Sequence, residues 1–173
     1  MPTVMVVYGT RPEAIKLAPV VIALREVSGL RVVVAVTGQH RAMLDQVNEL
    51  FGIVPELDLD VIQPRQQLHT MSQRILDGLT ESVRAVRPDA VLVQGDTTTA
   101  FIASLAAFYE QVAVFHVEAG LRTTDRYNPF PEEMNRRLTS QLTSLHLAPT
   151  PLSRDNCCAT GSTPPTSSSP GTP

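Results

Sequence analysis

The chain has 173 residues, 43% of them hydrophobic, and its 14 basic and 17 acidic side chains leave a net charge of −3. These values are typical of one globular domain, and a slightly acidic chain without a basic run does not indicate a nucleic-acid-binding protein. No stretch approaches the roughly 20 apolar residues of a membrane span, and the first residues lack the basic region of a signal peptide, so we expect a cytoplasmic protein.

Apolar runs alternate with helical patterns along the whole chain. The expected strands cover residues 4–7, 30–36, a short piece of 53–64, 89–93, 112–117 and 145–148. The expected helices begin at Pro12, lie around 43–50, cover 67–86, 97–109 and 132–145, and begin again at Pro151. The first of them has apolar residues at helical spacing, namely Ile15, Ala18, Val21 and Ile22. This alternation predicts an α/β fold with a Rossmann-like, doubly wound parallel sheet.

The composition changes abruptly near the end. From Ala159 to Pro173 every residue except the first is Ser, Thr, Pro or Gly. Such a segment buries too little apolar surface to offset its ordering entropy. We therefore expect a domain over residues 1–156 and a disordered tail over 157–173. The adjacent Cys157 and Cys158 indicate neither a disulfide framework nor a metal site.

Three carboxylates stand at the ends of predicted elements. Asp96 and Glu118 each follow a strand, and Glu132 opens a helix. Ligands of doubly wound sheets bind outside the carboxyl ends of the strands, so Asp96 and Glu118 should lie on one rim with Glu132 close by. Neighbouring carboxylates do not ionise equally easily, which suits them to acid and base roles. The alternative is that Asp96 and Glu132 only cap helices.

The turn after the first strand reads Gly9-Thr10-Arg11-Pro12-Glu13. It has neither the G-x-G-x-x-G spacing nor the P-loop pattern, so neither NAD nor ATP is indicated, and we expect no cofactor. Arg11 and Lys16 stand beside the positive end of a helix, where they can hold an anionic or polar ligand. The alternative for both is a solvated surface charge.

Five segments together resemble a known family: GTRPEAIKLAPV, TGQH, QGDTTTA, HVEAGLRT and NPFPEEMNRR. They are similar to the successive motifs of the non-hydrolysing UDP-N-acetylglucosamine 2-epimerases, from about Val4 to Asn156. The resemblance implies the N-terminal half of a glycosyltransferase-B-type fold, with a nucleotide-sugar cleft between two Rossmann-like domains. It implies interconversion of UDP-N-acetylglucosamine and UDP-N-acetylmannosamine by elimination and re-addition of UDP, in a protein that is commonly a homodimer.

The resemblance also assigns roles by motif. Asp96, Glu118 and Glu132 match the acid/base candidates, and Arg11, Lys16 and Arg136 match polar or cationic substrate-binding residues. A second UDP-N-acetylglucosamine acts as an activator in bacterial members, and the matching positions here are Gln39, His40, Arg65 and Gln66. A polar turn is the alternative for Gln39 and His40, and Ala42 replaces a longer polar residue of many relatives. His116 either orients the site or is structural.

Other functions stay open at this point. A hydrolysing epimerase shares much of the pattern but releases free N-acetylmannosamine and UDP. A glycosyltransferase of the same fold needs no set of three carboxylates. A non-catalytic fragment is the third alternative, because the second, UDP-binding domain is absent from the sequence, and we expect little or no activity from this chain alone.

The tail itself suggests a reading-frame shift at Asn156. With suitable codons, the shifted frame after Asn156 reads Leu-Leu-Arg-Asn-Arg-Ile-Asp-Pro and later Val-Val-Thr-Gly-Asn-Thr, which match the expected continuation of the family. A closed or unrelated alternative frame in the nucleotide sequence would show that the tail is genuine.

Overall fold

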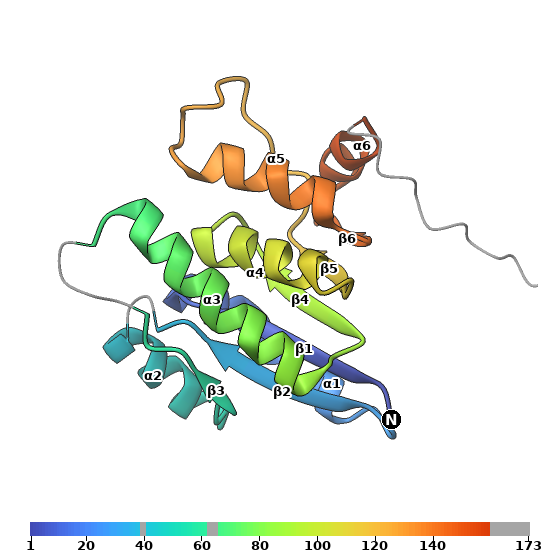
Figure 1. Ribbon diagram of the computed structural model, residues 1–173. Coiled ribbons are helices and arrows are strands. Elements are labelled where there is room, and N and C mark those ends of the chain that lie inside the picture. The colour runs from blue at the N-terminus through green and yellow to red at the C-terminus, as the bar shows by residue number, and fades with distance from the viewer. Residues whose placement is uncertain (39–40, 62–65, 160–173) are drawn as a thin grey trace, which may run out of the picture.

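The computed structural model describes residues 1–38, 41–61 and 66–159, which form one sheet covered by helices (Figure 1). The strands are β1 Thr3–Tyr8, β2 Arg31–Val36, β3 Leu57–Asp58, β4 Ala90–Gln94, β5 Ala113–Val117 and β6 Leu145–Leu147. The helices are α1 Arg11–Arg25, α2 Arg41–Leu50, α3 Leu68–Val86, α4 Thr98–Tyr109, α5 Glu132–Leu142 and α6 Pro151–Ala159. The predicted α/β class is confirmed.

All strand pairs of the sheet are parallel, and the strand order is β3-β2-β1-β4-β5-β6. Strands β1, β2 and β3 follow one another toward one edge of the sheet. Strand β4 then pairs with the other side of β1, with Val4 opposite Ala90. The strand order therefore reverses between β1 and β4. In doubly wound folds this switch point opens a crevice at the carboxyl ends of the strands, where ligands bind.

Alternate residues of the strands face two separate hydrophobic cores. Met5 and Val7 of β1 pack with the core under α3 and α4, whereas Val6 and Tyr8 pack with the core under α1 and α2. Figure 1 shows α3 and α4 on the viewed side of the sheet. Because both faces are covered, the strands are almost continuously apolar, and this is why they were predictable from the sequence.

Several predicted helix details are wrong in ways that packing explains. The helix expected to reach Leu145 ends at Leu142, because Thr143 is already extended and leads into β6. On α1, Ile15 and Ile22 recur at helical spacing with Ala18 and Val21 but are 45% and 41% exposed. The buried stripe of α1 consists instead of Glu13, Ala14, Leu17, Ala18 and Val21.

The last described helix passes the expected end of the domain. α6 continues beyond Asn156 to Ala159, and Cys157 is 5% exposed. A Cβ on Gly120 would lie 1.9 Å from the carbonyl oxygen of Ser153 and 2.8 Å from Cys157 Sγ, so α6 packs directly on the backbone at Gly120. The first three residues of the expected tail are therefore helical, and residues 160–173 lie outside the described part of the chain.

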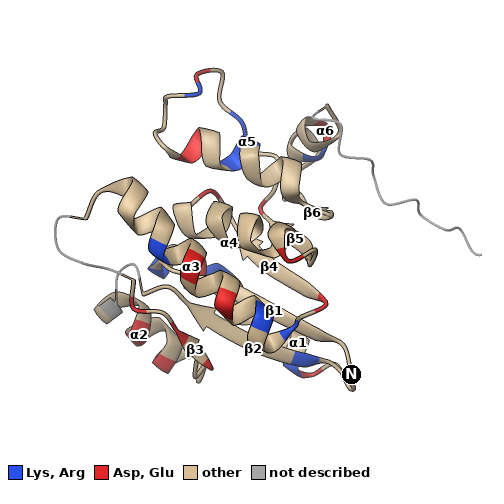
Figure 2. Cartoon of the chain, viewed as in Figure 1, with Lys and Arg blue, Asp and Glu red and all other residues tan. Residues whose placement is uncertain are grey.

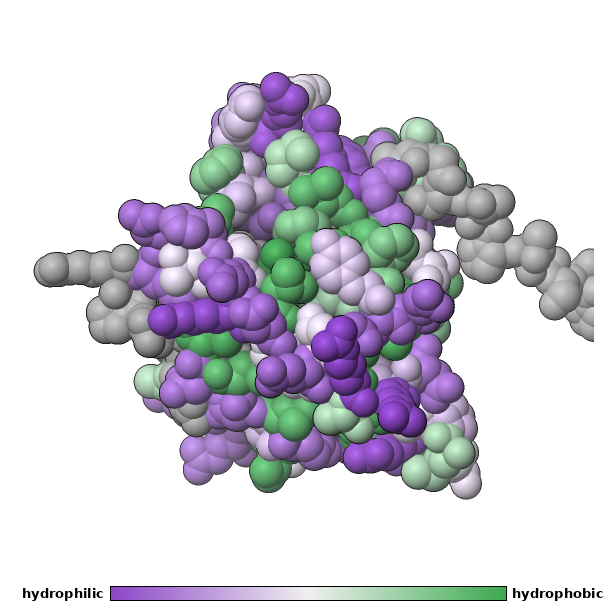
Figure 3. Space-filling view, in the orientation of Figure 1, coloured by the Kyte–Doolittle hydropathy of each residue, from purple (hydrophilic) through white to green (hydrophobic). Residues whose placement is uncertain are grey.

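The viewed surface is polar along α3 and more apolar near α4 and α5. Figure 2 shows positive and negative residues mixed along α3. Figure 3 shows a hydrophobic area over the part of the molecule where α4 and α5 lie, and Phe108, Tyr109 and Leu138 on these helices are exposed. Within the described ranges, no helix is long and apolar enough to cross a membrane.

Candidate active site

The turn from β1 into α1 forms the first wall of the site. Gly9 approaches its neighbours so closely that a Cβ there would lie 2.2 Å from Thr37 Oγ1 and 2.5 Å from Thr99 Oγ1. Only glycine fits this position without moving the two threonines. The turn then delivers Thr10 as the N-cap of α1, with Arg11 and Pro12 in the first turn of the helix.

Glu13 links the turn after β1 to the turn after β4 by hydrogen bonds. Its carboxylate is 1% exposed and accepts hydrogen bonds from the backbone N–H groups of Gly9 at 3.0 Å and Thr10 at 2.8 Å. Its other oxygen accepts the hydroxyl of Thr97 at 2.6 Å, across 84 positions of sequence. Burial raises the pKa of Glu13, and these hydrogen bonds oppose that shift. The turns after β1 and β4 are thereby held together.

The turn after β4 forms the second wall and carries Asp96. Gly95 has a φ of +73°, a conformation that glycine adopts readily. Thr97, not Asp96, is the N-cap of α4, because its side chain accepts the N–H of Ala100 at 3.0 Å. Helix capping therefore does not explain the position of Asp96.

Glu118 forms the third wall, directly after β5. It has a φ of +62°, which is uncommon for a residue other than glycine. Such a conformation costs about 1–3 kcal/mol, persists only when the surrounding structure enforces it, and is concentrated at functional sites. Its Oε2 accepts Lys16 Nζ at 2.6 Å and also the side-chain amide of the buried Gln94.

These three turns enclose a pocket of about 570 Å³ at the switch point of the sheet. Its lining includes four of the predicted site residues, Arg11, Lys16, Asp96 and Glu118. It also includes Thr10, Pro12, Glu13, Met43, Gln94, Gly95, Thr97 and Leu121. The structure thus brings together two carboxylates and two cations that are far apart in the sequence, as their positions after the predicted strands and at the start of the first helix predicted.

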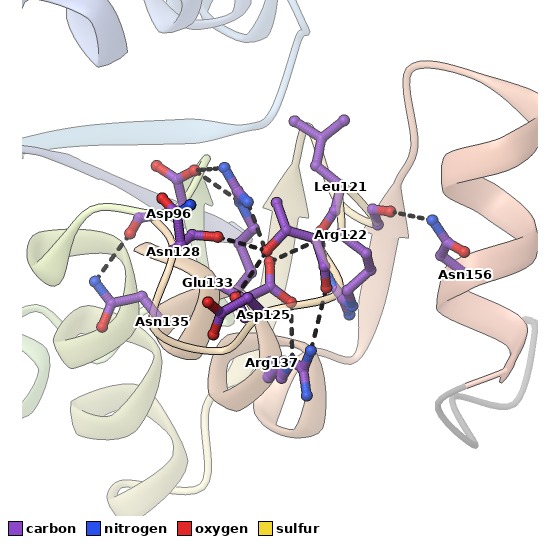
Figure 4. A network of polar contacts seen from close by, with 12 residues as sticks. Asp96, Leu121, Arg122, Asp125, Asn128, Glu133, Asn135, Arg137 and Asn156 are labelled. Atoms are coloured by element: carbon purple, nitrogen blue, oxygen red, sulfur yellow. Dashed lines mark hydrogen bonds and ion pairs between the residues drawn. The ribbon is translucent and has the colours of Figure 1, made fainter. Parts of the chain in front are cut away.

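Arg136 reaches the same site from α5 but binds Asp96 instead of lining the pocket. Its Nε and Nη2 lie 2.8 Å and 2.6 Å from Asp96 Oδ2. Asn135 donates its side-chain amide to the backbone carbonyl of Asp96 at 2.9 Å (Figure 4). Helix α5 therefore holds both the backbone and the carboxylate of Asp96.

Glu132 is half-buried at the first position of α5 and is not among the residues that line the pocket. The N-cap of this helix is Pro131, and no side chain caps it. Residues four apart share one face of a helix, so Glu132 lies one turn from Arg136 on the face that meets Asp96. The contact of Glu132 with a ligand therefore stays a prediction.

The predicted activator site lies mostly outside the described residues. Gln39, His40 and Arg65 lie outside the described residues. Gln66 is half-buried at the start of the described segment 66–159. The second ligand therefore stays a prediction.

Four buried polar residues of the site were not predicted: Glu13, Gln94, Glu133 and Asn135. Glu13 and Gln94 line the pocket, and Glu133 binds the guanidinium of Arg136 with Nη1 at 3.1 Å. The spacing of Glu133 to Arg136 and Arg137, three and four residues along a helix, is the one sequence signal that indicates such a cluster.

His116 lies beneath the site on β5 and is 1% exposed. Its Nε2 is 2.7 Å from the carbonyl oxygen of Gly95, which assigns the ring proton to Nε2. Burial lowers the pKa of His116 to about 4. His116 therefore supports the turn that presents Asp96 and stays neutral there, and its side chain is not in the pocket lining.

The fold and the pocket define a doubly wound α/β domain with a candidate ligand site at the switch point of its sheet. MurG from Acinetobacter baumannii has a similar fold, with a TM-score of 0.65 at 16% identity over 88% of this chain and 43% of that one. This likeness supports the glycosyltransferase-B type of fold and nothing further.

Sequence comparison is more specific. A family model described as UDP-N-acetylglucosamine 2-epimerase matches residues 22–166. The UDP-N-acetylglucosamine 2-epimerase of Escherichia coli K12 is 55% identical over 153 residues, which are 88% of this chain and 41% of that protein. The crystal structure of UDP-GlcNAc 2-epimerase from Neisseria meningitidis bound to UDP-GlcNAc superposes with a TM-score of 0.89 at 50% identity, over 92% of this chain and 43% of that one.

This chain belongs to the UDP-N-acetylglucosamine 2-epimerase family. It spans about two fifths of the length of the relatives it matches.

Proposed function

We propose that this chain supplies the acid/base residues of a non-hydrolysing UDP-N-acetylglucosamine 2-epimerase, which interconverts UDP-N-acetylglucosamine and UDP-N-acetylmannosamine. The proposal is supported by the family match and by the UDP-GlcNAc bound to the Neisseria meningitidis relative. Because the chain covers only part of the relatives, the activity is proposed for a complete two-domain protein.

The reaction inverts the configuration at C2 of the sugar. A base removes the proton from C2, the bond between C1 and the diphosphate oxygen breaks, and the electron pair leaves with UDP. A 2-acetamidoglucal with a C1–C2 double bond remains. UDP then adds back at C1 while a proton reaches C2 from the opposite face, so atoms and charge balance over the cycle.

The observation that supports this chemistry most is the placement of Asp96 and Glu118 in one pocket with Arg11 and Lys16. C2 carries a weakly acidic proton, so its removal and return need positioned bases and acids on both faces. The departing diphosphate gains negative charge, which nearby cations stabilise. Glu132 completes the set of three acid/base candidates, and Arg136 serves the site by holding Asp96.

The hydrolysing epimerase is the alternative with the same first half-reaction. In that case water instead of UDP adds to the 2-acetamidoglucal, and the products are free N-acetylmannosamine and UDP. The test uses a joined protein in which residues 1–156 of this chain replace the corresponding part of the Escherichia coli relative. We expect NMR to show UDP-N-acetylmannosamine forming from UDP-N-acetylglucosamine. Free N-acetylmannosamine would assign the hydrolysing reaction, and no turnover would refute the proposed function.

Two further properties belong to the same proposal. A second UDP-N-acetylglucosamine would bind beside the site as an activator, at Gln39, His40, Arg65 and Gln66, and sigmoidal dependence of the rate on substrate would support it. The complete protein would be a homodimer, and light scattering on the joined protein tests this.

A further inference from the structure

Glu133 is a fully buried carboxylate one residue beyond the predicted site residue Glu132. It is 0% exposed, and three donors surround it: Arg137 Nε at 2.8 Å from Oε1, and the backbone N–H of Thr123 at 3.0 Å and Arg136 Nη1 at 3.1 Å from Oε2. A charge is retained in such a place only when it is paired and hydrogen-bonded. Burial alone would raise the pKa of Glu133, but the hydrogen bonds from Arg137, Thr123 and Arg136 bring it below its ordinary value.

The guanidinium of Arg136 bridges two carboxylates. One edge, Nε and Nη2, meets Asp96 Oδ2, and the remaining nitrogen, Nη1, meets Glu133 Oε2. The side chain of Arg136 is only 15% exposed. Because the guanidinium is planar and rigid, contacts at all three nitrogens fix both its position and the direction of its plane. The position of Arg136 therefore depends on the charge of Glu133.

Asp96 lines the pocket, whereas Glu133 and Arg136 do not. Arg136 holds the Asp96 carboxylate through its Oδ2. Asn135 holds the backbone carbonyl of Asp96 (Figure 4). Displacing a reacting group by about 1 Å can cost roughly 100-fold in rate. A change at Glu133 would reach the reaction only by moving Arg136 and, through it, Asp96.

We propose that Glu133 is a positioning residue for the epimerisation, acting through the Arg136 guanidinium to aim the Asp96 carboxylate at the sugar. This inference rests on the proposed function. It adds a residue that does not touch the pocket and a defined chain of contacts from Glu133 to Arg136 to Asp96.

A purely structural role for Glu133 is the competing explanation. Arg137, the other arginine on Glu133, also donates to the backbone carbonyl of Thr123 at 3.2 Å, and Glu133 accepts the N–H of Thr123. These contacts tie α5 to the segment after β5 and do not involve Asp96. Both arginines bind Glu133, but only Arg136 binds Asp96. Variants of the two arginines therefore distinguish a positioning role of Glu133 from a purely structural one.

The experiment compares Glu133→Gln, Arg136→Lys, Arg137→Lys and the double variant Glu133→Gln/Arg136→Lys in the joined protein, with kcat, KM and thermal unfolding as readouts. We expect Glu133→Gln and Arg136→Lys each to lower kcat by roughly 100-fold with KM little changed. The double variant should fall no further than the single ones, because the two residues act through one contact chain. Arg137→Lys, the matched control, should keep kcat near the wild-type value while it lowers the unfolding temperature.

Each contrary result has a definite meaning. Three results would overturn the positioning role while leaving the proposed function intact. They are a normal kcat in folded Glu133→Gln, equal kcat losses in Arg136→Lys and Arg137→Lys, and kcat losses that multiply in the double variant. Absence of turnover in the unmutated joined protein would instead refute the proposed function. If Glu133→Gln does not fold, equal kcat losses in Arg136→Lys and Arg137→Lys would still overturn the positioning role.

Discussion

Lys16 and Glu118 form an ion pair across the pocket, with 2.6 Å between Nζ and Oε2, although 102 positions of sequence separate them. Lys16 comes from the second turn of α1, and Glu118 from the end of β5. The pair spans the switch point of the sheet and places opposite charges on the lining of the pocket.

We expect Lys16→Met to reduce activity much more than stability. The side chains of Lys16 and Glu118 are 49% and 27% exposed, and ion pairs near the surface contribute at most about 1 kcal/mol. Loss of a cation that stabilises the leaving diphosphate should lower kcat of the joined protein by roughly 100-fold. Arg25→Met is the control, because Arg25 pairs with Glu56 at 3.5 Å, is similarly exposed, and lies outside the pocket lining. Equal kcat losses in both variants would contradict this role of Lys16.

Gly9→Ala should destabilise the domain, because the new methyl group would overlap Thr37 Oγ1 and Thr99 Oγ1. Both threonines are 0% exposed and have stiff, branched side chains, so we expect a loss of about 1–3 kcal/mol in denaturant unfolding. Gly78→Ala in α3 is the contrast. Its methyl group would meet only the flexible end of Leu59 at 3.2 Å, and alanine is the better helix former. A stability of Gly9→Ala equal to that of the wild type would show that the turn is looser than described.

His116 should make stability depend on pH in the acid range. Burial lowers the pKa of His116 to about 4, below its ordinary value of 6.5. The unfolded chain therefore binds this proton first, and stability that is complete above pH 6.5 is lost as the pH falls toward 4. The loss specific to His116 is about 3 kcal/mol. His116→Gln keeps a donor for the Gly95 carbonyl but does not titrate.

The measurement is the free energy of unfolding of both chains between pH 7 and pH 4. The wild type should lose about 3 kcal/mol more than His116→Gln over this range, since the carboxylates titrate in both. Parallel curves would mean that His116 is protonated as easily in the folded domain as in the unfolded chain.

The sequence predicted the sheet and the pocket well for a physical reason. Strands covered on both faces are apolar throughout, and the turns that follow β1, β4 and β5 place Arg11, Asp96 and Glu118 at one rim wherever the strands are parallel. These features depend on local pattern and on one topological rule, so no knowledge of distant contacts was needed.

The polar interior could not be predicted in the same way. Helix α5 has no apolar stripe, and its buried residues are Glu133, Asn135, Thr139 and Ser140. Periodicity therefore does not tell which of the adjacent Glu132 and Glu133 turns inward. Glu13 reads as an ordinary acidic residue of a first helical turn, because its decisive partner, Thr97, lies 84 positions away.

The most direct test of the central claim is deuterium incorporation at C2 of UDP-N-acetylglucosamine, followed by NMR in D2O with the joined protein. We expect the unmutated protein to incorporate deuterium. Asp96→Asn, Glu118→Gln and Glu132→Gln should abolish the exchange while thermal unfolding shows an intact fold. Near-normal incorporation in both Asp96→Asn and Glu118→Gln would contradict the account, because the two carboxylates that line the pocket would then not be the acid and base of the reaction.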